Sequence, residues 1–519
     1  MRFLKLGVWV GLCLVIACQK KVSQTETSAV VPDRVTYHLA LQAEASDLFS
    51  VRVDLPLLSE ADQVFQFCAT APGTYQVMDI GRLVRTFDVY DEKGQLVPVK
   101  QQGVNSWLIS DPKSARVIRY TIAETFDTEL DEHPIYQMAG TSIEKDHAFI
   151  CAHAVFGFFP NRQTQALDLK LDAPKDWQVG TALTPYETVD NGNRTVRAYT
   201  VEDYDTFVDS PILAGTLSVA EEQIGTCQFQ VFSYSKSGKV ESQAILDAVR
   251  EDLEGLRAFL KQFPIDHYVF LFHFEDRTVG AWEHSYSSDY VMSEKNFDKS
   301  LKERIPDFVN HETFHMVTPL HIRSEKIVPY NFVEPQPTRH IWFFEGVTEW
   351  AAQTLQLRGG LVTLEEYLRS MKQKLFYSNF MAKDISLADM GLQSFTPRGQ
   401  SVFGNFYMKG ALNGMLLDIL ILEKSGGKQG LREVILQLKE KYGPKRVFKE
   451  DAFYDELAAL TDPAIKTYLE TYVDGTEELP IREMMNKVGI DFTLANGFTV
   501  LENPTPEQLA LREVWLKNL

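Results

Sequence analysis

Apolar and polar residues alternate in short runs along the first part of the chain, from about residue 35 to residue 226. Residues 35–41, with the sequence V-T-Y-H-L-A-L, have the period of two that is typical of a strand with one buried face. Turn-forming pairs such as Asn191-Gly192 separate the runs. The pattern predicts an N-terminal β-rich, sandwich-like domain over residues 33–226.

Helical periodicity takes over after residue 243. It predicts a helix over residues 244–263, and the apolar run at residues 267–272 predicts a buried strand. The clearest later helices are predicted over residues 361–377, 411–424, 431–442 and 464–472. Together these elements predict an α+β multidomain fold: a mixed domain over residues 227–360, a helical domain over residues 361–478 and a short segment over residues 479–519. That last segment is too short for us to predict a domain or a role for it.

The net charge of the chain argues against one class of partner. The chain has 519 residues and a formal net charge of −19, which argues against a nucleic-acid-binding surface. Its 45% hydrophobic and 24% charged residues are ordinary for a globular protein with large cores.

The N-terminus has the pattern of an export signal. Arg2 and Lys5 precede an apolar run that ends at Ala17, too short to span a bilayer comfortably but suited to a secretory signal. The sequence V-I-A-C at residues 15–18 resembles a bacterial lipobox, in which the signal (residues 1–17) is removed and Cys18 is lipidated. Residues 18–32 are polar and predict a flexible tether. We therefore expect a lipid-anchored protein of the bacterial cell envelope, at the outer membrane, with its body facing the periplasm or the cell surface. A plain signal peptide or an uncleaved anchor is the alternative.

Three cysteines remain in the predicted mature body, Cys68, Cys151 and Cys227. An odd number permits at most one internal disulfide, and the sequence does not show whether one forms. Their wide separation predicts no cysteine metal cluster.

The sequence H-E-T-F-H at residues 311–315 is the main chemical motif. On a helix, His311 and His315 lie one turn apart and can bind one Zn²⁺ from the same face, with Glu312 beside the metal-bound water as a general base. Apolar residues at helical spacing and the Thr318-Pro319 stop predict a helix of about three turns around the motif. An ordinary amphipathic helix with unrelated histidines is the alternative.

A catalytic zinc site needs a third protein ligand and one open position. The segment W-F-F-E-G at residues 342–346 offers Glu345, an acid that is expensive to bury after three aromatic residues unless it is paired. Glu349, one turn further on, is placed to hydrogen-bond a ligand histidine and orient it. The alternative is a solvent-exposed acid on the surface of the helix. His321 and His340 have no matching position, and we predict that neither is a ligand.

Two more segments add substrate chemistry. Gly280-Ala281-Trp282-Glu283-His284 follows a predicted strand, and a strand edge with a carboxylate is suited to an extended peptide and its free ammonium group. Tyr407, in the sequence F-Y-M-K-G, begins a predicted helix, where its hydroxyl can donate to a developing oxyanion. Alone, the first segment would be a turn and Tyr407 a core residue.

In this order the segments resemble the glycyl aminopeptidase family of gluzincin metallopeptidases, usually drawn with a C-terminal PDZ domain. P-G-T-Y at residues 72–75, a downstream Trp107 and Y-D-T-F-V-D-S-P at residues 204–211 are similar to the family's N-terminal domain. Residues 280–284 resemble its G-G-L-E-H pattern, and residues 407–410 its Y-x-K-G pattern. The resemblance covers about residues 35–492, and it implies a thermolysin-like zincin fold for residues 227–360.

The resemblance implies one Zn²⁺ ion held by His311, His315 and Glu345, with Glu312 as general base. It further implies that Tyr407 stabilises the tetrahedral intermediate and that Glu283, with Gly280 and Ala281 on the same segment, binds the free amino terminus of a peptide substrate. The expected activity is that of a zinc aminopeptidase.

Departures from the family pattern limit what can be said about the substrate. Trp282 replaces a smaller residue and is expected to narrow the site, and V-T-P-L-H at residues 317–321 replaces W-N-V-K-R. Only about 27 residues follow Phe492, too few for a PDZ domain, so we expect none. The preferred first residue and the oligomeric state are not predicted. Two other functions stay open: a catalytically idle peptide-binding surface lipoprotein, and a zinc endopeptidase or amidase.

Overall fold

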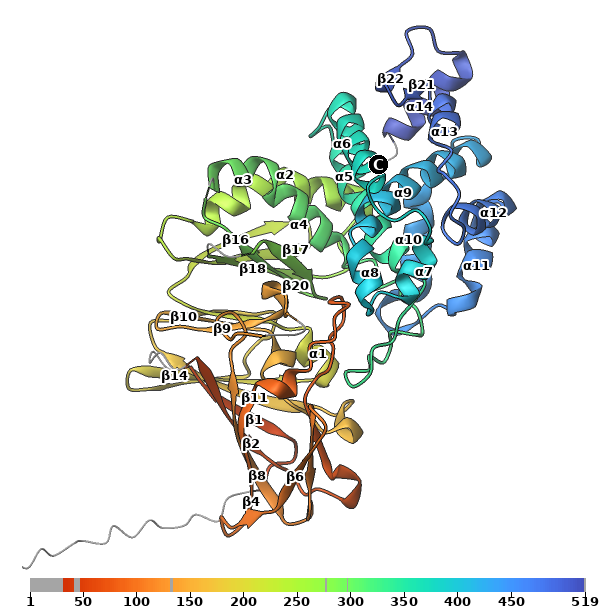
Figure 1. Cartoon of the computed structure of the whole chain (residues 1–519). Helices are drawn as coiled ribbons and strands as arrows, with labels where there is room; N and C mark the ends of the chain where they lie inside the picture. Colours follow the sequence, from red (N-terminus) through yellow and green to blue (C-terminus); the bar gives the residue numbers. More distant parts are fainter. Residues whose placement is uncertain (1–30, 42–46, 131–133, 276–277, 296, 518–519) are drawn as a thin grey trace, which may run out of the picture.

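A computed structural model describes residues 31–41, 47–130, 134–275, 278–295 and 297–517. The β-rich N-terminal part forms one end of the molecule, a smaller sheet covered by helices lies next to it, and the C-terminal helices pack beside that sheet (Figure 1). This mixed α+β architecture confirms the fold class predicted from the sequence.

The N-terminal part is built on an eight-stranded sheet in which, among the described residues, β1 with β11 is the only parallel pair. Tyr37 and Leu39 of β1 are buried while His38 between them is partly exposed, as the alternating sequence predicts. In sheet order the strands are β13 (Glu187–Asn191), β14 (Arg194–Val201), β11 (Leu167–Pro174), β1 (Thr36–Ala40), β2 (Leu48–Asp54), β8 (Ala115–Ala123), β4 (Val84–Asp91) and β5 (Leu96–Val97).

Two smaller sheets and several short helices complete this part. The four-stranded sheet contains β12 (Gln178–Gly180), β15 (Ile212–Gly215), β10 (His147–Ile150) and β9 (Thr141–Ile143); the three-stranded sheet contains β3 (Val64–Gln66), β7 (Ser106–Ile109) and β6 (Val99–Gln102). The short helices are η1 (Glu60–Asp62), η2 (Ile80–Leu83), η3 (Gln137–Ala139), η4 (Ala152–Ala154), η5 (Pro160–Arg162) and α1 (Tyr204–Val208). An aromatic core that includes Phe65, Phe67 and Tyr120 lies between the sheets.

The central sheet has the order β16 (Ser218–Ile224), β17 (Cys227–Ser235), β18 (His267–Phe274), β20 (Ser287–Met292) and β19 (Gly280–Glu283). Phe270 and Phe272 belong to the core shared with the helices, whereas Val269 and Leu271 belong to the core shared with the N-terminal part. Because both faces of β18 are covered, this strand is a continuous apolar run. β16 pairs with β17, so this sheet begins at Ser218, before the boundary predicted at residue 226.

Helices cover the remaining face of this sheet and continue to the C-terminus. They are α2 (Ser242–Leu260), α3 (Phe297–Glu303), α4 (Ile305–Phe314), the π-helix η6 (Trp342–Val347), α5 (Thr348–Gly359), α6 (Leu364–Ser378), α7 (Leu387–Leu392), α8 (Pro397–Val402), α9 (Asn405–Lys424), α10 (Leu431–Tyr442), α11 (Phe453–Leu460) and α12 (Pro463–Tyr472), with 3-10 turns η7 (Gly443–Lys445) and η8 (Glu450–Ala452). In the part of the chain that the structure describes, none of the helices has the length and apolar character needed to cross a membrane.

The last segment folds onto the helical part. It consists of α13 (Ile481–Lys487), the hairpin β21 (Ile490–Thr493) and β22 (Gly497–Val500), and α14 (Pro506–Lys517). Met485 and Trp515 are buried in the same core as α9, so the segment completes the helical layer and does not stand as a separate unit.

Candidate active site

The two motif histidines lie at the end of α4. The sequence predicted a helix through residue 318, but α4 ends at Phe314, and His315 is the residue that caps it. The backbone of His315 is still helical (φ −60°, ψ −17°), so both rings stay on one face, with their centroids 4.8 Å apart. The early end does not disturb the pairing of the two imidazoles.

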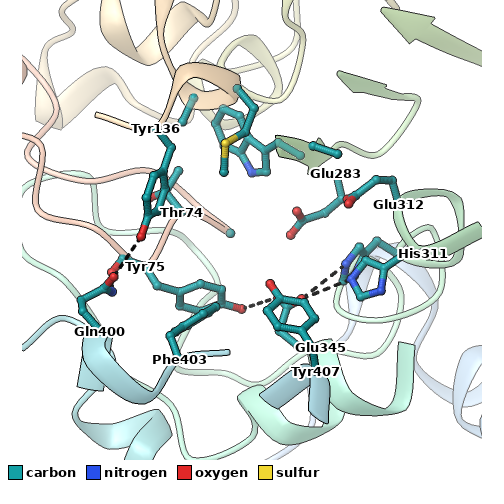
Figure 2. Close-up of a pocket in the computed structure, with 16 residues that line it drawn as sticks. Thr74, Tyr75, Tyr136, Glu283, His311, Glu312, Glu345, Gln400, Phe403 and Tyr407 are labelled. Atoms are coloured by element: carbon teal, nitrogen blue, oxygen red, sulfur yellow. Dashed lines mark hydrogen bonds and ion pairs between the residues drawn. The ribbon is translucent and has the colours of Figure 1, made fainter. Parts of the chain in front are cut away.

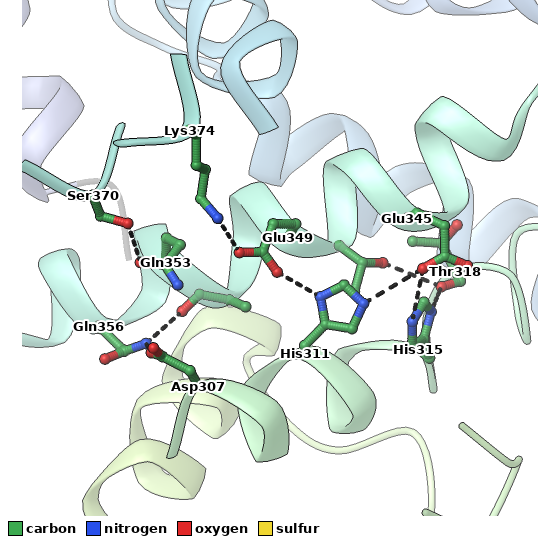
Figure 3. A network of polar contacts seen from close by, with 12 residues as sticks. Asp307, His311, His315, Thr318, Glu345, Glu349, Gln353, Gln356, Ser370 and Lys374 are labelled. Atoms are coloured by element: carbon green, nitrogen blue, oxygen red, sulfur yellow. Dashed lines mark hydrogen bonds and ion pairs between the residues drawn. The ribbon is translucent and has the colours of Figure 1, made fainter. Parts of the chain in front are cut away.

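Both imidazoles are oriented through their Nδ1 atoms (Figure 3). His311 Nδ1 lies 2.8 Å from Glu349 Oε2, and His315 Nδ1 lies 2.8 Å from the carbonyl oxygen of Thr318. Lys374, on α6, forms an ion pair with the other oxygen of Glu349. Burial alone would raise the pKa of Glu349, but Lys374 and His311 lower it to about 2. Glu349 is therefore a half-buried carboxylate that contacts His311 on the side away from Glu345.

Glu345 comes to the same point from η6. Its Oε2 atom lies 3.5 Å from His311 Nε2 and 3.7 Å from His315 Nε2. The segment is a π-helix, a form that often occurs at functional sites. Gly346 contacts Gly410 of α9 so closely that a Cβ atom on Gly346 would lie 2.6 Å from the Cα atom of Gly410. This glycine contact brings η6 and α9 together and explains both glycines in the motifs.

The three side chains fit a metal ion. One ligand atom from each of His311, His315 and Glu345 lies within 4.8 Å of the others, and all three residues are buried. The Nε2 atoms remain available because Glu349 and Thr318 occupy the Nδ1 atoms. Burial lowers the pKa of His315 to about 4, which keeps its ring in the neutral form that binds metal. Glu283, Glu312 and His315 form a second group of the same size; we prefer the first group because its two imidazoles are held in place.

Glu312 and Glu283 add two carboxyl groups on the open side of this cluster (Figure 2). Burial raises the pKa of Glu312 to about 8, while the neighbouring His311 acts to lower it and Glu345 to raise it. Burial also raises the pKa of Glu283 well above its usual value, and the charges of Glu345 and Glu312 raise it further. Since carboxylates this close oppose one another's ionisation, the site favours the binding of positive charge.

These side chains line a cavity of about 180 Å³. Ala281 and Glu283 reach it from β19, which pairs only with β20 among the described strands and is therefore an edge strand. Gly280, on the same strand, is packed against Met138, and a Cβ atom there would lie 2.7 Å from its sulfur. Tyr407 lines the cavity from the first turn of α9, with its ring centroid 5.5 Å from that of His311.

Trp282 lines the cavity, but its side chain is also packed against the N-terminal part. Its side chain is buried in the core of the N-terminal part, its indole N–H donates to the carbonyl oxygen of Pro72 (3.1 Å), and its ring contacts His153 and His284. The indole of Trp282 therefore packs between the central sheet and the N-terminal part.

A buried ion cluster lies behind Glu283. His284 Nε2 lies 3.1 Å from Asp289 and its Nδ1 lies 3.4 Å from Asp209. Burial alone would lower the pKa of His284, but the hydrogen bonds to the two aspartates raise it to about 9. This imidazolium also lowers the pKa of both Glu283 and Glu312, so it offsets part of the negative charge of the site.

The sequence analysis missed Lys374 and the side chain of Tyr75. Lys374 carries no motif, and its role depends on how α6 packs; Tyr75 was noticed only as part of the N-terminal signature at residues 72–75. The other two histidines are occupied elsewhere: His340 Nε2 lies 2.8 Å from the carbonyl oxygen of Glu450, and His321 hydrogen-bonds the carbonyl oxygen of Met316. The cysteines Cys68, Cys151 and Cys227 are all free and buried.

The fold and this group of side chains define a metallopeptidase. The family model of the Peptidase M61 N-terminal domain matches residues 36–216, and that of the M61 glycyl aminopeptidases matches residues 304–412. Together the two matches cover more than half of the chain, and the chain belongs to this peptidase family.

Solved structures agree with the fold. An aminopeptidase N family protein from Idiomarina loihiensis is 19% identical, with a TM-score of 0.77 over 88% of this chain and 78% of its own. An M1 zinc metallopeptidase from Deinococcus radiodurans is 12% identical, with a TM-score of 0.56 over 86% and 95%. A mutant of the Deinococcus enzyme was solved with a Tyr-Ser-Ala substrate (12% identity, 86% and 95% coverage, TM-score 0.55). A search of curated proteins gave no match.

Proposed function

We propose that this chain is a zinc aminopeptidase that removes residues from the free N-terminus of peptides. The observation that carries the proposal is the position of Glu283: its carboxyl group faces the cavity, and one of its oxygens lies within 4.8 Å of ligand atoms of both Glu312 and His315. A carboxylate at this distance from the reacting groups is suited to hold an ammonium group one residue away from the bond to be cut.

His311, His315 and Glu345 would hold the zinc ion, which when bound supplies a polarised water molecule and a Lewis acid for the substrate carbonyl. Glu312 takes the proton from the attacking water and delivers it to the nitrogen of the leaving amine. Tyr407 donates its hydroxyl proton in a hydrogen bond to the carbonyl oxygen as that oxygen becomes negative. The edge strand β19 is suited to align the peptide backbone through main-chain hydrogen bonds.

The first test is a panel of aminoacyl amides and short peptides, with zinc measured on the same sample. We expect release of the first residue from free peptides and none from the N-acetylated forms, because acetylation removes the charge that Glu283 binds. Glu283→Gln should lower kcat/KM for free peptides by about 10- to 100-fold, since it removes a hydrogen bond between charged groups.

The outcome separates the competing functions. Equal cleavage of free and acetylated peptides would favour an endopeptidase or amidase. Zinc binding without cleavage of any member of the panel would favour a peptide-binding protein that has lost catalysis. The same panel reports the preferred first residue.

We also propose that the protein is a lipoprotein of the bacterial envelope, anchored through Cys18. The lipobox-like residues 15–18 support this proposal, and they lie outside the described residues. We expect palmitate labelling of the full-length protein in cells and none of Cys18→Ala. Equal labelling of the two proteins, or none of either, would contradict the anchor.

A further inference from the structure

One wall of the cavity beside the proposed metal site is formed by residues 73–75 of the N-terminal part. Residues 72–75 belong to the N-terminal part and contact β19 and η6; Figure 2 shows Thr74 and Tyr75 beside the cavity. The carbonyl oxygen of Pro72 accepts the indole N–H of Trp282. Gly73 has φ +72°, and a Cβ atom there would lie 2.6 Å from Glu283 Oε1, so only glycine fits. This loop is in contact with the amine-binding end of the site.

Tyr75, at the end of the same loop, contacts the proposed metal ligand Glu345. Its hydroxyl donates to Glu345 Oε1 at 3.1 Å. Its backbone has φ +49°, a left-handed conformation that is uncommon for residues other than glycine and persists only where the surroundings hold it. The surroundings here come from α8 and its C-terminal end: Gln400 Nε2 donates to the carbonyl oxygen of Tyr75 at 2.6 Å, and the ring of Phe403 lies 5.0 Å away.

The two oxygens of Glu345 therefore have different partners. Oε1 accepts the hydrogen bond from Tyr75, and Oε2 faces His311 and His315. Each of the three proposed ligands has an orienting partner: Glu349 for His311, the carbonyl oxygen of Thr318 for His315, and Tyr75 for Glu345, whose carboxylate also interacts with the hydroxyl of Tyr407. Glu349 and Thr318 follow the motif helix α4 in the chain, whereas Tyr75 belongs to the N-terminal part.

We propose that Tyr75 is a positioning residue of the metal site: its hydroxyl fixes the carboxylate of Glu345 with Oε2 toward the two histidines. The N-terminal part then contributes to metal affinity as well as to the shape of the pocket. The proposal rests on the proposed metal-binding function of the site, and it adds a group that the ligand set alone does not identify.

The test compares single Tyr→Phe changes in the full chain. Zinc affinity is measured by competition with a chelator, and thermal unfolding is followed with and without zinc. Tyr75→Phe should weaken zinc binding by about 10- to 100-fold, the usual effect of losing a partner that orients a ligand. It should also reduce the increase in Tm that zinc produces, because the stabilisation of the folded state by a ligand rises with the logarithm of its affinity. The Tm of the zinc-free variant should stay close to that of the wild type.

Two matched variants make the comparison specific. Tyr136→Phe removes a hydroxyl that donates to Gln400 Oε1 (3.2 Å) at the same boundary and does not touch Glu345, so its zinc affinity should equal that of the wild type. Tyr407→Phe should lose kcat even at saturating zinc, because its hydroxyl, which also hydrogen-bonds Glu345, donates to the substrate carbonyl oxygen. At saturating zinc, Tyr75→Phe should recover kcat with little change in KM.

Three results would overturn the proposal: unchanged zinc affinity in Tyr75→Phe, an equal loss in Tyr136→Phe, or a loss of kcat in Tyr75→Phe that saturating zinc does not reverse. The last result would make Tyr75 a catalytic residue. Failure of the proposed function is a separate outcome, because it appears in the wild type as zinc binding without hydrolysis and leaves the ratio of affinities measurable.

Discussion

Glu312→Gln is expected to lower kcat by about 10²- to 10⁴-fold while the protein still binds zinc, the range usually lost with a general acid or base. Glutamine has the size and shape of glutamate but cannot take a proton from water. Glu312 is only 6% exposed and its backbone is part of α4, so the substitution leaves the surrounding packing intact. Steady-state rates on a cleaved aminoacyl substrate and zinc content of the same preparation measure the two effects.

The raised pKa of Glu312 is consistent with this role. In the protein alone, burial places its pKa at about 8. A nearby dication favours the ionised form and lowers the pKa again. The pKa of Glu312 is thereby moved from about 8 toward neutral pH. A group that first accepts and then donates a proton works best with a pKa in that range.

A matched control distinguishes loss of the base from a general charge effect. Glu303→Gln changes an exposed acid at the end of α3, which is paired only with Lys299 among the contacts found in the described residues, and should leave kcat unchanged. A zinc-loaded Glu312→Gln protein that hydrolyses substrate at the wild-type rate would remove Glu312 from the mechanism. If zinc content falls together with rate, the variant has damaged the site and Glu312 is not tested by it.

Much of the site could be predicted because the chemistry fixes residue types at fixed spacing. His311 and His315 are four residues apart, and the backbone keeps them on one face even though the helix ends between them. Glu345 was predicted as the third ligand because it follows three aromatic residues and needs a partner when buried, and its Oε2 atom lies beside both histidines. Local spacing and burial, which are properties of short segments, were sufficient for these three.

The rest depends on packing between distant segments. Tyr75 and Glu345 are 270 residues apart, and no local pattern brings them together. The π-helix at residues 342–347 follows the close approach of Gly346 to Gly410, which a helical period does not reveal. Strand pairing likewise places residues 218–224 in the central sheet, since β16 turns back onto β17.

The C-terminal segment gives the second large expected effect, because Arg358 of α5 joins it to α9. Arg358, on α5, forms an ion pair with Asp418 of α9 at 2.6 Å, with both side chains fully buried. Its Nε atom donates to the carbonyl oxygen of Trp515 in α14 at 2.9 Å. Arg358→Met should lower the free energy of unfolding by about 3–5 kcal/mol, since it leaves the charge of Asp418 buried without its partner.

The double variant Arg358→Met/Asp418→Asn tests the cause of that loss. Asparagine keeps an oxygen for the backbone N–H of Leu431, which donates to Asp418 Oδ1 at 2.8 Å, and it removes the uncompensated charge. Urea unfolding followed by tryptophan fluorescence should therefore show the double variant to be more stable than Arg358→Met. If the two are equally unstable, lost packing and not charge is responsible. The zinc affinity of the folded single variant should stay at the wild-type value, because the ion pair of Arg358 with α9 and its hydrogen bond to α14 involve none of the three ligands. A fall in zinc affinity would mean that this ion pair sets the spacing of η6 and α9 at Gly346 and Gly410. That spacing would then fix the position of Glu345.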